Sequence, residues 1–243
     1  MKRLFISLAI LAGISLSSCN DSFLEKTPVT DLTENNAFNS YDNFKAFMWP
    51  CYEMFTNNTI RTSLQGFGQD GQYKGDMAAG YFQQKYESGY NEFAYQTVAS
   101  VASGNGWDFK SFIRRVNIML SHIDNSSMTE AQKDHWRAVG YFFHSFWYME
   151  LIDRFGDVPW VDQVLQEDSP EAYGPRVDRK TVADKVLERL QWAEQNIGNF
   201  TSQDGDNTIN QDCVRAVISR FGLREGTWRK YHQLGDAEKY QHE

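Results

Sequence analysis

The chain has 243 residues with a formal net charge of −8, and 41% of the residues are hydrophobic. A surface this acidic argues against nucleic acid and anionic lipid as binding partners. The length suits about one domain, and three cysteines are too few for a disulfide framework. Cys51 and Cys213 could pair in an oxidising compartment, but nothing in their spacing requires it, so we expect two unpaired, buried thiols.

The first residues have the three parts of a secretory signal peptide. Lys2 and Arg3 give a basic start, and the apolar stretch of residues 4–16 follows. This stretch is shorter than the roughly 20 apolar residues of a transmembrane helix. Small residues end it, so we predict that residues 1–18 form a signal peptide that is removed.

The end of this stretch, LSSC over residues 16–19, resembles the lipobox of bacterial lipoproteins. The resemblance implies that Cys19 becomes the N-terminus and carries acyl chains such as palmitate, and two or more chains anchor a protein firmly. The residue after it is Asn20 rather than Asp, which favours the outer membrane, with exposure at the cell surface. The alternative is an unmodified cysteine after an ordinary signal. Residues 19–36 are polar and are expected to be a lipid-anchored tether.

A helix is predicted over residues 39–56, where apolar residues recur at helical spacing. Ser40 is the expected N-cap, and Pro50 is expected to kink or split the helix because it lacks a backbone N–H. Residues 57–106 differ, because they are rich in glycine and tyrosine. Glycines at this density make long helices improbable, so we predict an irregular loop region that is functional or disordered.

Four more helices are predicted, over residues 107–124, 130–155, 180–197 and 210–224. A capping box of Thr129 with Gln132, or of Ser127 with Glu130, starts the second, and Gly156 and Pro159 end it. Asn210 or Asp212 is expected to cap the last. Short connections favour two antiparallel pairs, which hint at a tetratricopeptide-like arrangement, although the tetratricopeptide motif itself is not matched. The expected fold class is mainly α.

Three motifs occur in the order of a known family. They are FIRRVNIMLSHI, HWRAVGYFFHSFWYMELIDRFGDVPWV and RKTVADKVLERLQWAEQNI. Together with the lipobox they resemble the SusD/RagB family of outer-membrane nutrient-binding lipoproteins, over residues 19 to about 228. The run WRAVGY at residues 136–141 keeps the family pattern only loosely.

The resemblance implies a helical lipoprotein that captures a glycan or a peptide and passes it to a TonB-dependent outer-membrane transporter, without enzymatic activity. Family members are usually longer, so we expect residues 37–243 to be the N-terminal portion of a SusD-like domain whose C-terminal part is absent. A scaffold that binds the transporter but no solute is the second possibility.

The Gly- and Tyr-rich region offers the groups that a sugar needs. Aromatic faces cover the apolar face of a sugar ring, and polar side chains satisfy its hydroxyls. The alternative is that these side chains pack loops onto the helices, most of all for Trp107. The predicted ligand-binding residues are Tyr73, Asp76, Tyr81, Tyr86, Tyr90, Asn105 and Trp107.

Arg114, Arg115 and Asn117 are polar residues of a helix with a broad apolar face. We interpret them as structural, with hydrogen bonds between helices or at a helix end and an ion pair. Arg154, between Asp153 and Asp157, is likewise interpreted as part of a structural turn.

No catalytic or metal-binding motif is present in the chain. The sequence lacks GxSxG and HExxH, and its histidines show no metal-ligand spacing. A glycosidase needs two carboxylates about 5–10 Å apart. Asp70, Asp76 and Glu87 would serve, but any acidic chain offers such sets. We therefore expect no enzyme activity, no cofactor and no metal.

Overall fold

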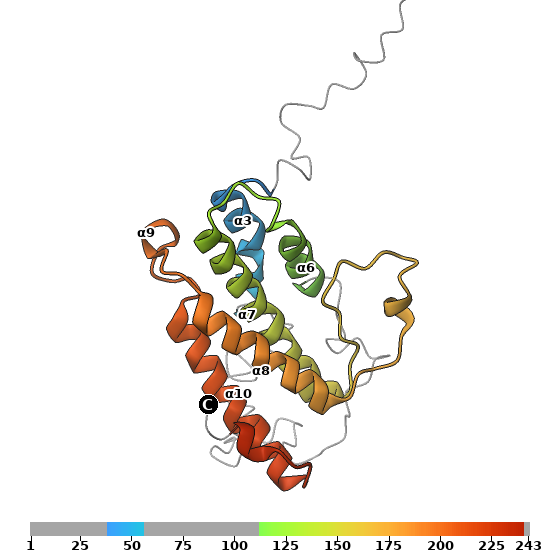
Figure 1. Ribbon diagram of the computed structural model, residues 1–243. Helices are drawn as coiled ribbons and strands as arrows, with labels where there is room; N and C mark the ends of the chain where they lie inside the picture. Colours follow the sequence, from blue (N-terminus) through green and yellow to red (C-terminus); the bar gives the residue numbers. More distant parts are fainter. Residues whose placement is uncertain (1–37, 56–111, 241–243) are drawn as a thin grey trace, which may run out of the picture. The chain divides into compact units, whose positions relative to one another are not determined.

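The computed structural model describes residues 38–55 and 112–240. The chain divides into two units, residues 1–37 and 38–243, and every described residue belongs to the second. The described residues form helices and loops, with one isolated β-bridge between Val158 and Val177, so the mainly α fold is confirmed. In chain order the helices are α3 (Tyr41–Met48), the 3-10 helix η2 (Trp49–Phe55), α6 (Phe112–His122), α7 (Glu130–Phe155), the 3-10 helix η4 (Pro170–Tyr173), α8 (Arg179–Asn196), α9 (Thr201–Asp204), α10 (Gln211–Tyr231) and the 3-10 helix η5 (Ala237–Tyr240), most of them labelled in Figure 1.

Helix α7 is buried along most of its length because it packs against both α6 and α8, and α8 in turn packs against α10 (Figure 1). This position explains why its sequence carries apolar residues on more than one face. Gly140 permits the close approach of α6, because a Cβ atom there would lie 2.6 Å from Met119 Cε. The helix pairs expected from the sequence are therefore neighbours in space, while their tetratricopeptide-like geometry stays a prediction.

The two ends of α7 follow from local sequence. Thr129 is the N-cap and forms a complete capping box with Gln132. The alternative box was wrong, because the Ser127 hydroxyl donates to the carbonyl of Asn39 at 2.7 Å instead. Gly156 ends the helix with a φ of 69°, a left-handed conformation that costs glycine little.

The N-terminal helix changes form at Pro50, as predicted. The Ser40 hydroxyl accepts from the N–H of Asn43, and the α-helix ends at Met48. The 3-10 helix η2 then carries Pro50 in its first turn, where a missing N–H costs little. Cys51 in η2 is buried, whereas Cys213 is only half-buried, and both are free thiols.

Helix α10 is longer than predicted, because it runs to Tyr231 rather than residue 224. Asn210 is its N-cap. Gly222 and Gly226 lie near the predicted end at residue 224, where they lower helix propensity. Both glycines are buried in the helix, so tertiary packing outweighs propensity here. The single turn α9 was not predicted, since four residues are too few for a periodic pattern.

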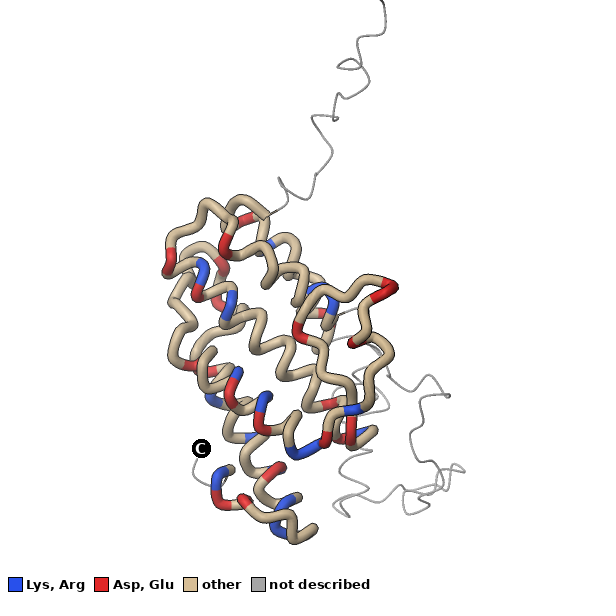
Figure 2. The backbone as a smooth tube through the Cα atoms, turned by 45° about the vertical axis from the view of Figure 1, so that its right-hand side comes forward, with Lys and Arg blue, Asp and Glu red and all other residues tan. Residues whose placement is uncertain are grey.

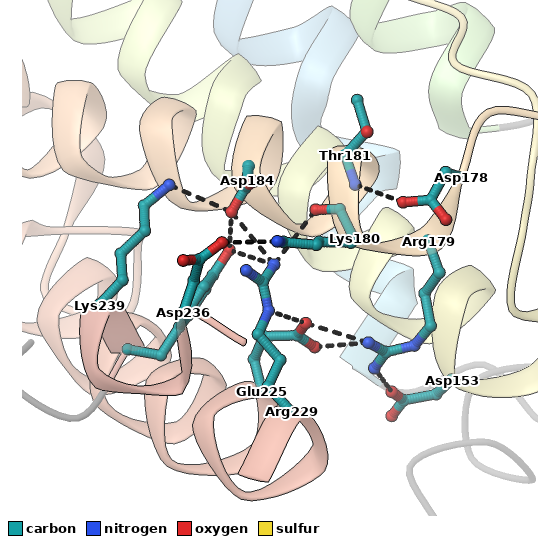
Figure 3. A network of polar contacts seen from close by, with 11 residues as sticks. Asp153, Asp178, Arg179, Lys180, Thr181, Asp184, Glu225, Arg229, Asp236 and Lys239 are labelled. Atoms are coloured by element: carbon teal, nitrogen blue, oxygen red, sulfur yellow. Dashed lines mark hydrogen bonds and ion pairs between the residues drawn. The ribbon is translucent and has the colours of Figure 1, made fainter. Parts of the chain in front are cut away.

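A polar network joins α8, α10 and η5 (Figure 3). Arg229 Nε pairs with Glu225 at 2.8 Å, both side chains being 0% exposed, and Arg179 also pairs with Glu225 at 2.8 Å. Arg229 reaches Asp184 at 3.1 Å, and the Tyr240 hydroxyl donates to the same carboxylate at 2.6 Å. Charged residues of both signs lie along the helices (Figure 2), and at this junction Tyr240 and Lys239 bind Asp184 and tie η5 to α8.

None of the described helices combines the length and apolar character needed to cross a bilayer.

Candidate functional site

All seven predicted ligand-binding residues, the carboxylates Asp70 and Glu87 and the lipid-attachment residue Cys19 lie outside the described residues. Their roles stay predictions. The described residues contain no group of three or more His, Cys, Asp or Glu side chains that could hold a metal ion. The described part of the chain nevertheless contains a hollow lined by aromatic and charged side chains, which the segment after α7 helps to build.

Polar residues of α6 hold the segment that follows α7. The buried Asn117 donates through Nδ2 to the carbonyls of Val161 at 3.1 Å and Gln163 at 3.0 Å. Arg114 donates to the carbonyl of Leu165 at 2.7 Å. Arg115, on another face, donates to the carbonyl of Phe47 in α3 at 2.8 Å. The structural interpretation of all three polar residues is therefore confirmed.

Two residues of α7, Tyr148 and His144, also hold the segment that follows this helix. Tyr148 donates to the carbonyl of Pro159 at 2.9 Å and accepts from the N–H of Val161 at 2.7 Å. His144 Nε2 lies 2.9 Å from the carbonyl of Val161, which can only accept, so this nitrogen carries a proton. Burial lowers the pKa of His144 well below its usual value and keeps the ring neutral. Trp160, between these anchored residues, packs against both rings.

The acidic residues at the end of α7 serve a structural turn, in which they contact Arg224 and the first residue of α8. Asp153 pairs with Arg224 and lies 3.8 Å from Arg179. Asp157 accepts from the N–H of Arg179 at 2.8 Å. The first residue of α8 is thus bound to the end of α7.

The hollow, called here the Trp160 hollow, has a volume of about 240 Å³ and lies where α7, α8 and the segment after α7 meet. Lys185, Arg189 and Trp192 reach it together because their spacing of four and then three residues places them on one face of α8. Its lining residues are Tyr141, Trp160, Asp162, Lys185, Glu188, Arg189 and Trp192.

Aromatic rings and cations alternate across the Trp160 hollow. The guanidinium carbon of Arg189 lies 4.9 Å from the centre of the Tyr141 ring and 4.8 Å from that of Trp160. Lys185 Nζ lies 5.2 Å from the same Trp160 ring. On the other side Trp192 packs edge-on against Tyr141, with ring centres 5.2 Å apart. These distances fall within the roughly 6 Å range of cation–π attraction.

Arg189 is incompletely paired. Its side chain is 16% exposed, and its ionic partner Asp162 lies 3.5 Å away, is 46% exposed and also accepts from Trp160 Nε1 at 2.9 Å. Arg189 Nη1 is buried without a hydrogen-bond partner, which costs about 1–3 kcal/mol. Burial lowers the pKa of Arg189, and the Asp162 carboxylate opposes that shift only in part. The Trp160 hollow thus holds a cation with unused hydrogen-bonding capacity.

A second hollow of about 280 Å³ lies between the start of α7 and the loops around α9. Its central group is Asp204, whose carboxylate accepts from the Tyr41 hydroxyl at 2.5 Å and lies 3.5 Å from His135 Nε2. Burial lowers the pKa of His135. Phe200 and His135 are the aromatic rings in its lining, so this hollow offers fewer aromatic rings to a ligand than the Trp160 hollow does. Its contacts instead tie α9 to α3.

The sequence did not single out the residues of the Trp160 hollow. Tyr141 and Trp192 fell on helix faces that looked like core, and Trp160 lay in a short extended piece. Only the spacing of Lys185, Arg189 and Trp192 on α8 could have indicated a common surface.

A family model described as "starch-binding associating with outer membrane" matches residues 22–223. The chain belongs to the SusD-like family. No curated protein is similar enough to count as a match.

Solved structures share the SusD-like fold at low identity. A SusD-like protein from Bacteroides fragilis is 18% identical with a TM-score of 0.56, and the match covers 84% of this chain and 39% of that one. A SusD-like carbohydrate-binding protein from Bacteroides vulgatus is 17% identical with a TM-score of 0.56, and the match covers 84% of this chain and 44% of that one. A SusD-like carbohydrate-binding protein from Bacteroides fragilis is 16% identical with a TM-score of 0.53, and the match covers 82% of this chain and 41% of that one. The chain therefore spans about two fifths of the length of these SusD-like structures.

Proposed function

We propose that the protein is an outer-membrane lipoprotein, anchored through Cys19, that captures an oligosaccharide and passes it to a TonB-dependent transporter without making or breaking a bond. The observation that carries this proposal is the Trp160 hollow, an aromatic and charged surface in a chain of the SusD-like family. The family's printed description and the carbohydrate-binding SusD-like structures support it.

The chemistry of the Trp160 hollow suits a sugar ring. Trp192 and Tyr141 are half-buried aromatic residues of the lining, and aromatic rings of this kind can cover the apolar face of a sugar. Asp162 and Glu188 accept hydrogen bonds from hydroxyls, whereas Lys185 donates. A volume of about 240 Å³ lies just below the roughly 300–1,000 Å³ of drug-sized ligand sites, so it fits one unit of a longer chain.

The predicted residues between Tyr73 and Trp107 remain part of this proposal as a further contact surface for the same ligand. Transfer to a transporter also requires that the protein release its load. We therefore expect micromolar rather than nanomolar affinity, which corresponds to about −8 kcal/mol rather than −12 kcal/mol.

Isothermal titration of the full chain in detergent with a panel of oligosaccharides tests the capture step. We expect heat with at least one oligosaccharide, and we expect Trp192→Ala to weaken its binding about tenfold, or 1.4 kcal/mol, because a stacking face is lost. Trp49→Ala is the matched control, since Trp49 is 52% exposed and lies outside the Trp160 hollow. Heat only with peptides would replace the glycan by a peptide ligand. No heat with either class would leave a scaffold, and released sugar fragments would indicate an enzyme.

Membrane fractionation tests the anchor. We expect the protein in the outer-membrane fraction, with an acylated Cys19 as its N-terminus by mass spectrometry. Cys19→Ser should move it to the soluble periplasmic fraction, while Cys213→Ser should leave it in place. An unmodified Cys19 in the mature protein would contradict the lipoprotein assignment.

A further inference from the structure

Two cations of α8 lie one helical turn apart beside the same ring. Lys185 Nζ and Arg189 Cζ are 5.2 and 4.8 Å from the centre of the Trp160 ring. Like charges four residues apart on a helix repel each other. Lys185 has no carboxylate partner among the described residues, and its ammonium group lies beside the Trp160 ring instead. The helix therefore tolerates this pair without a bridging anion of its own.

Among the described residues, Asp162 is the carboxylate that forms an ion pair with Arg189, and it neutralises the two cations incompletely. Asp162 stands 3.5 Å from Arg189 Nη2, and its hydrogen bond from Trp160 Nε1 holds it beside the indole rather than between the two cations. Arg189 Nη1 has no partner at all. The lowered pKa of Arg189 agrees with a guanidinium whose charge is balanced only in part. An anion placed between Lys185 and Arg189 would balance the charge that Asp162 leaves.

We propose that the Trp160 hollow selects an acidic sugar, whose ring stacks on Trp192 and Tyr141 and whose carboxylate binds Lys185 and Arg189. This inference rests on the proposed capture of a glycan and names its class. A carboxylate suits this pair because it accepts along the planar edge of a guanidinium, while an ammonium binds it as a point charge. The ligand displaces the half-exposed Asp162 from the guanidinium edge.

Glu188 limits the charge that the Trp160 hollow accepts. It is exposed, lines the hollow beside both cations, and has no ion pair among the described residues. The carboxylates of Glu188 and Asp162 would repel a ligand that carries more than one anionic group per ring. The combination favours a uronate with a single carboxylate over a polysulfated sugar, because like charges brought together in a partly buried site repel.

Titration of the full chain in detergent with two trisaccharides of equal length tests the inference. Trigalacturonate should bind at least about tenfold more tightly than neutral galactotriose, and its binding should weaken as salt rises. Lys185→Met keeps the aliphatic stem but loses the charge, so it should remove about tenfold from trigalacturonate affinity and weaken galactotriose binding much less, because galactotriose loses one neutral hydrogen bond and no ion pair. Lys230→Met, an exposed lysine of α10, is the matched control and should change neither affinity. Glu188→Gln should strengthen trigalacturonate binding.

The outcomes of this titration distinguish the acidic-sugar assignment from the proposed capture of a glycan. Equal binding of the two trisaccharides, or tighter binding of galactotriose, would overturn the acidic-sugar assignment and leave glycan capture standing. A polysulfated trisaccharide that outcompetes trigalacturonate would also overturn it, because the carboxylate would not be the preferred anion. Binding of acidic peptides without any trisaccharide, or no binding at all, would overturn both proposals.

Discussion

At the scale of single residues, polar side chains of α6 and α7 carry the candidate site although none of them lines it. Asn117 bonds two carbonyls of the segment that carries Trp160, and His144 bonds one of them from the opposite side. Each is a buried polar group, and such groups are costly unless they are paired. The sequence could show that Asn117 lies on a helix face, but not which carbonyls would meet it.

Asn117→Ala should reveal this role. The change removes the Asn117 donor of the Gln163 carbonyl and one of the two donors of the buried Val161 carbonyl, the other being His144, so we expect a loss of about 1–3 kcal/mol in the free energy of unfolding. Urea denaturation measures it, with Ser121→Ala as control, because Ser121 is exposed and bonds only within its own helix. A stability equal to that of the control would show that Asn117 does not hold the segment.

At the scale of elements, the helices were predictable where period and caps agreed. Helix α7 begins at a capping box and ends at a glycine, as expected, because both signals are local. Helix α10 ran past its predicted end for a non-local reason. Its last turns bury Glu225 and Arg229, which look like surface residues until Arg179, Asp184 and Tyr240 are placed around them (Figure 3).

Arg229→Met tests the weight of this junction. The substitution removes one of the two cations that pair with the fully buried Glu225, the other being Arg179, and breaking a buried ion pair on one side costs about 3–5 kcal/mol. Thermal and urea unfolding should show this loss. The double variant Arg229→Met, Glu225→Gln should regain part of it, because the buried carboxylate that has lost one of its two cations is replaced by a neutral amide. A double variant less stable than Arg229→Met would mean that Glu225 contributes chiefly through Arg179.

At the scale of the whole molecule, family motifs spread along the chain indicated the SusD-like fold, and the match over residues 22–223 bears this out. The Trp160 hollow could not be predicted in the same way. Its lining comes from α7, α8 and the loop between them, and only the packing of these elements turns Tyr141, Trp160 and Trp192 from apparent core residues into one surface. The ligand-binding role of the residues between Tyr73 and Trp107, which lie outside the described residues, stays a prediction.

The most direct test of the central claim, that the Trp160 hollow binds a sugar, is a crystal structure of the protein soaked with the oligosaccharide that titrates best. We expect one sugar ring against Trp192 and Tyr141, with polar groups of the ligand within about 3 Å of Lys185 or Arg189. An oligosaccharide bound elsewhere on the chain, with the Trp160 hollow occupied only by water, would contradict the account.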